Sequence, residues 1–150
     1  MSAVHADTLI HAPPASVWAM IMDPRRLAEW VTIHCEVTDV SAGAARVGFH
    51  MTQTIHLRGA KFKVRWKLAA CQPGRHAVWD GQGPARSRAW IEYRLTPEDG
   101  ATRFHYSNEF RAPLGPLGAV AGRALVGGIS EREAKRSLKA LKALLEHPGR

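Results

Sequence analysis

The sequence is poor in cysteine, and its two cysteines form no recognisable metal or redox motif. Cys35 and Cys71 lie far apart in a chain of 150 residues and belong to no Cys-x-x-Cys pair. Neither a disulfide framework nor a zinc ribbon is therefore indicated. Because a chain of this length buries enough surface to fold without such cross-links, we expect a single domain over residues 1–150 with reduced thiols.

Long apolar runs are also missing. The least polar stretch, residues 112–129, contains two prolines, five glycines and Arg123. This composition argues against a membrane-spanning helix. The N-terminal residues lack the charged and apolar regions of a secretory signal. We therefore expect a soluble, cytoplasmic protein, as a monomer or a homodimer.

Acidic residues are scarce relative to basic ones. The chain has 21 lysines and arginines against 13 aspartates and glutamates, which gives a formal net charge of +8. Such an excess favours contact with nucleic acid, anionic lipid or acidic ligands. It carries no information about the fold.

The usual catalytic signatures are absent. The sequence contains no Gly-x-Ser-x-Gly elbow, no His-Glu-x-x-His zinc site, no Walker loop and no glycine-rich dinucleotide fingerprint. Eight histidines occur, but none pair at metal-ligand spacing on a predicted helix. We expect neither a metal nor a cofactor.

Two short helices are predicted directly after a first strand at residues 4–11. The strand ends before Pro13 and Pro14, and proline is favoured at the start of a helix. Asp23 followed by a proline then predicts the N-terminus of a second, brief helix that ends near Trp30. Trp18 and Trp30 are interpreted as anchors that hold these helices against the sheet.

Between residues 33 and 111 the hydrophobic period is two, as in half-buried strands. Residues 61–68 alternate strictly between basic and apolar side chains, and residues 47–58 form an antiparallel partner. A second hairpin is predicted from strands at 89–95 and 104–110 joined by a turn at 97–100. Together with a shorter strand at 76–81, these hairpins predict a meander of about five or six strands in the middle of the chain.

After Pro116 the period returns to that of a helix. Leu138, Leu141 and Leu145 form an apolar stripe, with Lys142 among the positions expected to be exposed. Ser130 and Glu133 have the spacing of a capping box, so a long C-terminal helix is predicted to kink or restart there.

A strand, two short helices, an antiparallel meander and a long final helix make an α+β layout, in which the helix must cover one face of a curved sheet. Together with this order of elements, six segments that span essentially the whole chain carry a resemblance to a known family: residues 10–18, 23–30, 79–81, 96–102, 115–118 and 138–142. The chain resembles the START and Bet v 1-like (SRPBCC) superfamily of polyketide cyclase/dehydrase and lipid-transport proteins. This resemblance implies the helix-grip fold, in which a curved antiparallel sheet wraps around the C-terminal helix and leaves a cavity.

The resemblance makes residues on the apolar strand faces, and on the first part of the C-terminal segment, candidates for lining that cavity. Gln53 and Asn108 interrupt apolar faces, so each needs a hydrogen-bonding partner or a ligand. The predicted ligand-binding residues are Met51, Gln53, Trp66, Trp79, Tyr93, Tyr106, Asn108, Leu117, Val120, Ala121 and Ala124. The partner we expect is a small hydrophobic molecule such as a lipid, isoprenoid or polyketide.

Two other functions stay open. The same cavity suits a polyketide cyclase or dehydrase, although no residue is marked as catalytic. Lys61, Lys63, Arg65 and Lys67 point the same way and suit RNA, a ribosome or another polyanion. Because the strand alternates, a solvated face is the favoured explanation of these four cations, and nucleic acid is not the favoured partner.

Overall fold

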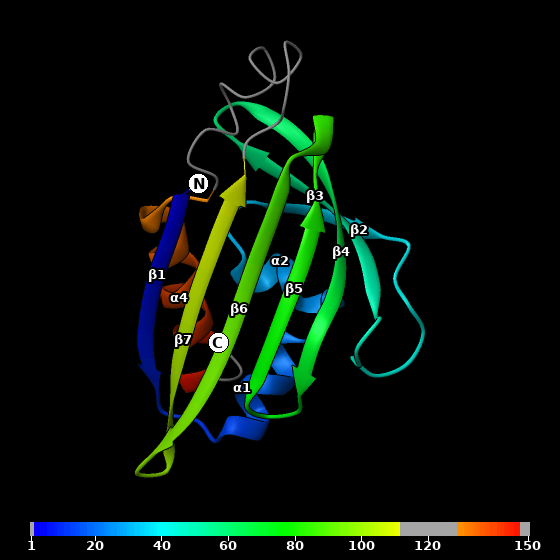
Figure 1. Ribbon diagram of the computed structural model, residues 1–150. Coiled ribbons are helices and arrows are strands. Elements are labelled where there is room, and N and C mark those ends of the chain that lie inside the picture. The colour runs from blue at the N-terminus through cyan, green and yellow to red at the C-terminus, as the bar shows by residue number, and fades with distance from the viewer. Residues whose placement is uncertain (1, 112–128, 148–150) are drawn as a thin grey trace.

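The computed structural model describes residues 2–111 and 129–147, which form one antiparallel sheet and the helices that line its concave side (Figure 1). The strands are β1 (Ser2–Ile10), β2 (His34–Thr38), β3 (His50–Leu57), β4 (Ala60–Gln72), β5 (His76–Gln82), β6 (Arg88–Glu98) and β7 (Ala101–Arg111). The helices are α1 (Pro14–Ile21), α2 (Leu27–Trp30) and α4 (Glu131–Glu146), with 3-10 turns η1 (Pro24–Arg26) and η2 (Pro84–Arg86). The predicted cavity residues Leu117, Val120, Ala121 and Ala124 lie outside the described residues.

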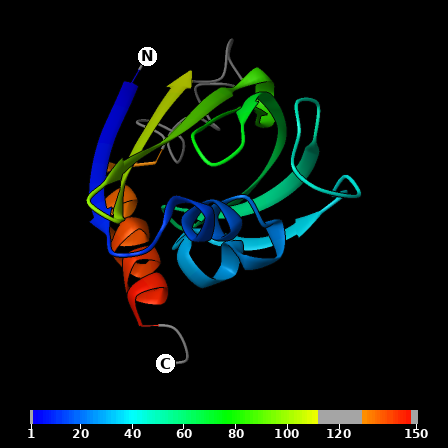
Figure 2. The ribbon, with the colours of Figure 1, turned by 90° about the horizontal axis from the view of Figure 1, so that it is seen from below.

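The sheet has the order β1-β7-β6-β5-β4-β3-β2. Strands β2 to β7 form the predicted meander, and β1 adds to its far side by pairing with β7. Viewed from below, the sheet curls so that α4 lies beside β1 while α1 and α2 lie across the concave side (Figure 2). The α+β helix-grip prediction is therefore confirmed.

Two-residue turns set the register of both predicted hairpins. Arg58 and Gly59 have φ values of 48° and 81°, and Asp99 and Gly100 have φ values of 50° and 81°. Positive φ at both central residues matches the right-handed twist of the flanking strands. The second turn is shorter than the predicted 97–100, because β6 continues through Pro97, which lies opposite Thr102.

The predicted strand at 47–58 starts too early. Val47 is 63% exposed, whereas the prediction placed it on the buried face with Phe49. Gly48 adopts φ +92° and reverses the chain between these two residues, so strand β3 begins only at His50. The first strand is likewise shifted from the predicted 4–11 to Ser2–Ile10.

The predicted helix caps are present. Asp23 accepts a hydrogen bond from the backbone nitrogen of Arg25, and the Ser130 hydroxyl accepts one from the backbone nitrogen of Glu133. Helix α4 starts directly after Ser130, as the capping spacing predicted. Only half of the capping box forms, because the Glu133 carboxylate accepts a hydrogen bond from Thr32 at 2.9 Å.

Helix α4 is fastened to β1 by polar contacts at its C-terminal end. The Lys142 ammonium donates to the backbone oxygen of Leu9 at 2.6 Å and to Glu146 at 2.7 Å. Glu146 in turn accepts from the backbone nitrogen of His11 at 2.8 Å. The prediction that Lys142 is exposed was wrong: the residue is half-buried, because its aliphatic stem follows α4 toward the strand.

Candidate functional site

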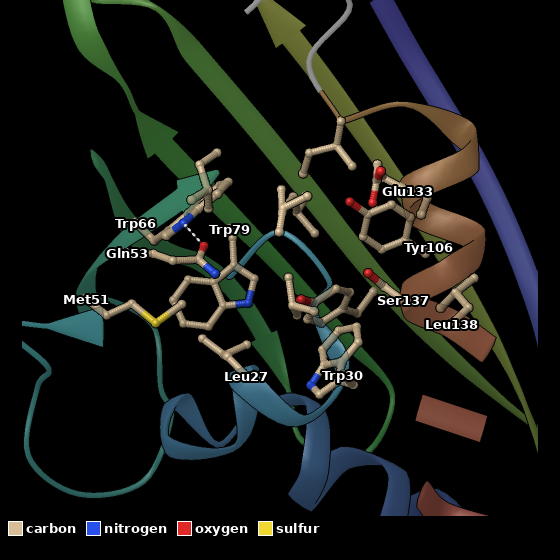
Figure 3. Close-up of a pocket in the computed structure, with 17 residues that line it drawn as sticks. Leu27, Trp30, Met51, Gln53, Trp66, Trp79, Tyr106, Glu133, Ser137 and Leu138 are labelled. Atoms are coloured by element: carbon tan, nitrogen blue, oxygen red, sulfur yellow. Dashed lines mark hydrogen bonds between the residues drawn. The ribbon is translucent and has the colours of Figure 1, made fainter. Parts of the chain in front are cut away.

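A pocket lies between the concave face of the sheet, the end of α2 and helix α4 (Figure 3). The strands contribute Met51, Gln53, Ile55, Trp66, Trp79, Ile91, Tyr93 and Tyr106. The remaining wall is formed by Leu27, Trp30, Val31, Ile33, Ile129, Glu133, Ala134, Ser137 and Leu138. About 650 Å³ of atom-free space lies between these side chains, mouth included, but only a small part of it admits the centre of a water molecule. The pocket is therefore a narrow apolar slot.

Most of the predicted lining residues come together here. Met51, Gln53, Trp66, Trp79, Tyr93 and Tyr106 all line this pocket. Asn108 instead lines a second, smaller space of about 490 Å³, mouth included, toward the other end of the strands. The two spaces share Ile55, Trp66, Ile91 and Ile129 as lining residues.

Trp66 can lie against the sheet because the residue opposite it is a glycine. Gly81 pairs with Trp66 across β4 and β5, and a Cβ atom at Gly81 would meet the Trp66 ring at 2.6 Å. Real Cβ atoms essentially never approach so closely. A side chain at position 81 would therefore displace the ring that borders both spaces.

Gln53 is 6% exposed, and its amide is fully oriented by two neighbours. The indole nitrogen of Trp66 can only donate, so it donates to Gln53 Oε1 at 2.9 Å (Figure 3). Gln53 Nε2 therefore faces His34 Nδ1, 2.9 Å away, and donates to it. This arrangement requires a neutral His34 with its proton on Nε2.

Burial lowers the pKa of His34 and so favours the neutral imidazole that this hydrogen bond requires. The charge of Glu36 opposes the shift. A chain of hydrogen bonds thus runs from edge strand β2 through Gln53 to the wall of the pocket. It satisfies the buried amide that the sequence left without a partner.

Asn108 is also satisfied by the protein. Its Nδ2 donates to the Tyr106 hydroxyl at 3.1 Å and to the backbone oxygen of Ile129 at 3.4 Å. Because the Ile129 carbonyl can only accept, the amide orientation follows. Asn108 therefore orients Tyr106 from the adjoining space.

Tyr93 and Tyr106 lie opposite each other on β6 and β7, with ring centroids 6.2 Å apart. Burial raises the pKa of Tyr106 to about 12 and raises the pKa of Tyr93 further above its ordinary value. Both phenols therefore stay protonated at neutral pH. They can donate hydrogen bonds into the pocket but are poorly suited to act as bases.

Sequence reasoning missed the contribution of α2 and α4 to the pocket. Trp30 packs against Tyr93 and Phe104, as an anchor would, but it also lines the pocket. On α4, Ser137 accepts a hydrogen bond from the backbone nitrogen of Thr32 at 3.1 Å. The spacing of Glu133, Ala134, Ser137 and Leu138 on one side of a helix was the available signal.

The charges in the pocket are few. Among the described lining residues, Glu133 carries the only charge, and there is no lysine, arginine or histidine. No group of three or more metal-binding side chains occurs within residues 2–111 and 129–147. In the same residues, no helix combines the length and apolarity needed to span a membrane.

The four cations of β4 lie on the opposite, convex face of the sheet. Lys61, Lys63, Arg65 and Lys67 are all exposed, and within the described residues none of them forms an ion pair. Arg65 contacts the neutral Gln82 at 3.3 Å. They are thus separated from the pocket by the sheet itself.

Trp90 also lies on the convex face, where its ring is covered by arginines. The guanidinium carbons of Arg88 and Arg111 lie 5.6 and 5.5 Å from the centre of the Trp90 ring. Arg88 is further held by Asp80 at 2.6 and 2.8 Å. Arg88 and Arg111 would therefore compete with an RNA base for stacking on the Trp90 ring.

Comparison with solved structures identifies the same fold in other proteins. TTHA0849 from Thermus thermophilus superposes with a TM-score of 0.77 at 18% identity, covering 99% of both chains. DynU16, from the dynemicin biosynthetic locus, superposes with a TM-score of 0.65 at 15% identity, covering 98% of this chain and 48% of its own. At these identities the likeness shows the fold.

The sequence comparisons are more specific. The chain is 22% identical over 133 residues to the uncharacterized protein Rv1546 of Mycobacterium tuberculosis, covering 87% of this chain and 93% of that protein. The family model described as "Polyketide cyclase / dehydrase and lipid transport" matches residues 1–146. The chain therefore belongs to the polyketide cyclase/dehydrase and lipid-transport family.

Proposed function

We propose that this protein binds a small hydrophobic molecule, such as a lipid, isoprenoid or polyketide, in the pocket between the sheet and α4. The observation that carries the proposal is a slot whose described wall is mostly apolar and aromatic, with a few oriented polar groups. Ligand-binding pockets in proteins typically have this composition. Affinity would come mainly from burial of apolar surface. Membership of a family that includes lipid-transport proteins supports the same conclusion.

Carriage or sensing is favoured over catalysis by the chemistry of the wall. An enzyme in this pocket would need a group that exchanges protons near neutral pH. The two phenols are shifted away from that range, and the described lining contains no histidine. A cyclase or dehydrase would therefore have to draw on Glu133, whose carboxylate is held by Thr32.

Native mass spectrometry of freshly purified protein tests the proposal. We expect a stoichiometric adduct of small mass, which solvent extraction then identifies. The Ile91→Phe variant adds bulk to the wall shared by both spaces and is expected to lose the adduct. The Val78→Phe variant adds the same bulk to the convex side of β5 and should retain it. Equal retention by both variants would place the adduct outside the pocket.

A second candidate function is contact with RNA through the convex face. The observation in its favour is the row of four β4 cations without acidic partners among the described residues. Such binding would weaken steeply with added salt. The Lys63→Glu/Lys67→Glu variant should then abolish it, and salt-independent or absent RNA binding would end this candidate.

A further inference from the structure

The two tyrosines of the pocket have hydroxyl protons that no described residue accepts. Tyr93 is 5% exposed and lines the pocket, yet its hydroxyl forms no hydrogen bond with residues 2–111 or 129–147. The fully buried side-chain atoms without a partner among the described residues are Trp30 Nε1 and Arg88 Nε, and the Tyr93 hydroxyl is not one of them. This hydroxyl is therefore open to a molecule in the pocket and can donate a hydrogen bond to it.

The Tyr106 hydroxyl offers a second proton, because its contact with Asn108 uses only its oxygen, as an acceptor. Asn108 Nδ2 must face the Ile129 carbonyl, so in the 3.1 Å contact it donates to the Tyr106 oxygen. The Tyr106 hydroxyl is thus an acceptor in that contact and keeps its own proton for another partner. Within the described residues no such partner occurs. Asn108 therefore acts as a positioning residue for the Tyr106 hydroxyl.

The rings that carry the two donors are neighbours in the wall. Tyr93 and Tyr106 occupy paired positions on β6 and β7, and their rings are inclined by 33°. Both stay neutral at ordinary pH because burial raises the pKa of each phenol. Both hydroxyls can therefore donate a hydrogen bond while they remain uncharged.

The charge of the pocket wall restricts which chemical groups of a ligand can lie next to these two donors. The described lining contains the Glu133 carboxylate and no cation. A buried anion needs a paired positive charge, and none is present among these residues. A carboxylate or phosphate headgroup is therefore disfavoured next to the two phenols.

We propose that the ligand is an uncharged, mostly apolar molecule with a carbonyl oxygen, and that the Tyr93 and Tyr106 hydroxyls donate hydrogen bonds to this oxygen. The inference rests on the proposed function, since it names the chemical class that the same pocket selects. It assigns the two tyrosines to ligand selection, with the aromatic and aliphatic wall supplying the remaining affinity.

Three naphthalenes of nearly equal shape test this inference by calorimetric or NMR titration. The probes are 2-acetylnaphthalene, 2-ethylnaphthalene and 2-naphthoate, which carry a ketone, a hydrocarbon and a carboxylate. We expect the ketone to bind about tenfold more tightly than the hydrocarbon, as one to two net hydrogen bonds would give. The carboxylate should bind most weakly.

The variants Tyr93→Phe and Tyr106→Phe remove only the hydroxyls. We expect each to reduce the preference for the ketone and the double variant to abolish it, with binding of 2-ethylnaphthalene unchanged. Tyr93→Phe removes no hydrogen bond within the described residues, so this variant should perturb folding less than Tyr106→Phe. Asn108→Leu should also weaken binding of the ketone, because the substitution removes the amide that orients Tyr106.

The possible results separate the two proposals. Equal binding of the ketone and the hydrocarbon by the unmodified protein would overturn the carbonyl inference and leave the hydrophobic pocket standing. Tightest binding of 2-naphthoate would overturn it as well. Failure of all three probes to bind would overturn the hydrophobic pocket and the carbonyl inference together.

Discussion

The two faces of the same sheet have opposite chemistry, and strand β4 shows the contrast most clearly. Val64, Trp66 and Leu68 are buried on the concave face, while Lys63 and Lys67 alternate with them on the convex face. Alternation along one strand separates the faces. The pocket can therefore vary independently of the charged surface, because no side chain of β4 takes part in both.

Two tryptophans illustrate what each face demands. On the concave face, the Trp66 N–H is satisfied by Gln53, and the ring lies against the backbone at Gly81. On the convex face, Trp90 is half-buried and covered by Arg88 and Arg111. A buried ring needs a partner for its polar atom, whereas a surface ring is stabilised by the stems and charges of flexible side chains.

The largest expected difference between the faces is in the free energy of unfolding after removal of a tryptophan. Trp66→Ala should cost about 3–5 kcal/mol, since it removes a buried ring and leaves the Gln53 amide without its donor. Trp90→Ala should cost about 1 kcal/mol or less, because it removes a partly exposed ring and its cation–π contacts. Urea unfolding of both variants measures the difference, and equal losses would contradict the distinction drawn between the faces.

The next largest effect concerns the contact that seats Trp66. Gly81→Ala should destabilise the fold by about 1–3 kcal/mol, because the added methyl group overlaps the indole ring and forces it to shift. Near-ultraviolet circular dichroism should report the changed environment of the ring. Gln82→Ala, at the exposed end of the same strand, serves as the control. An unchanged spectrum in Gly81→Ala would show that the ring does not depend on this glycine.

A smaller effect is expected from pH, through the hydrogen-bond chain that reaches the pocket from β2. The pKa of His34 is lower in the folded protein than in the unfolded chain, so the unfolded chain binds more protons below about pH 6.5. Stability should therefore fall as the pH drops from about 6.5 toward the native pKa, and then level off with respect to this group.

His34→Asn tests this dependence, because an asparagine oxygen can accept from Gln53 Nε2 without titrating. The variant should show a shallower loss of stability as the pH falls below about 6.5 in urea unfolding. An identical pH slope in both proteins would remove His34 from the explanation.

The smallest effect is expected on the convex face. Lys63→Glu/Lys67→Glu should change the free energy of unfolding by about 0.5 kcal/mol or less, because both lysines are exposed and form no ion pair among the described residues. Binding of 2-ethylnaphthalene should be unchanged as well. A change in that binding would mean that the two faces are coupled through the sheet.

Much of the fold was predictable because it depends on local chemistry. The alternation in β4, its hairpin with the preceding strand and the caps at Asp23 and Ser130 each involve neighbouring residues, and the structure contains them all. The errors at Val47 and Lys142 have a different origin. Gly48 reverses the chain, and β1 supplies a carbonyl to Lys142 from a distant part of the sequence. Hydrophobic periodicity alone predicts neither the chain reversal nor this long-range contact.

The candidate site was predictable as a set of inward-facing residues but not as an arrangement. Six of the predicted residues line one pocket, whereas Asn108 lines the adjoining space and orients Tyr106. The curvature of the sheet determines which inward positions share a space. The α4 residues Glu133 and Ser137 were missed, because their contact with Thr32 joins parts of the chain about a hundred residues apart.

The pattern of side chains along the chain was sufficient to establish which residues form strands and helices and which face each of them buries. That information is local, since hydrophobic period, turn residues and caps act over a few positions. The packing of distant elements established the rest: the neutral state of His34, the orientation of Gln53 and the two tyrosine protons that no described residue accepts. Hydrogen bonds act over about 3 Å, so their partners exist only once the sheet has curled around α4.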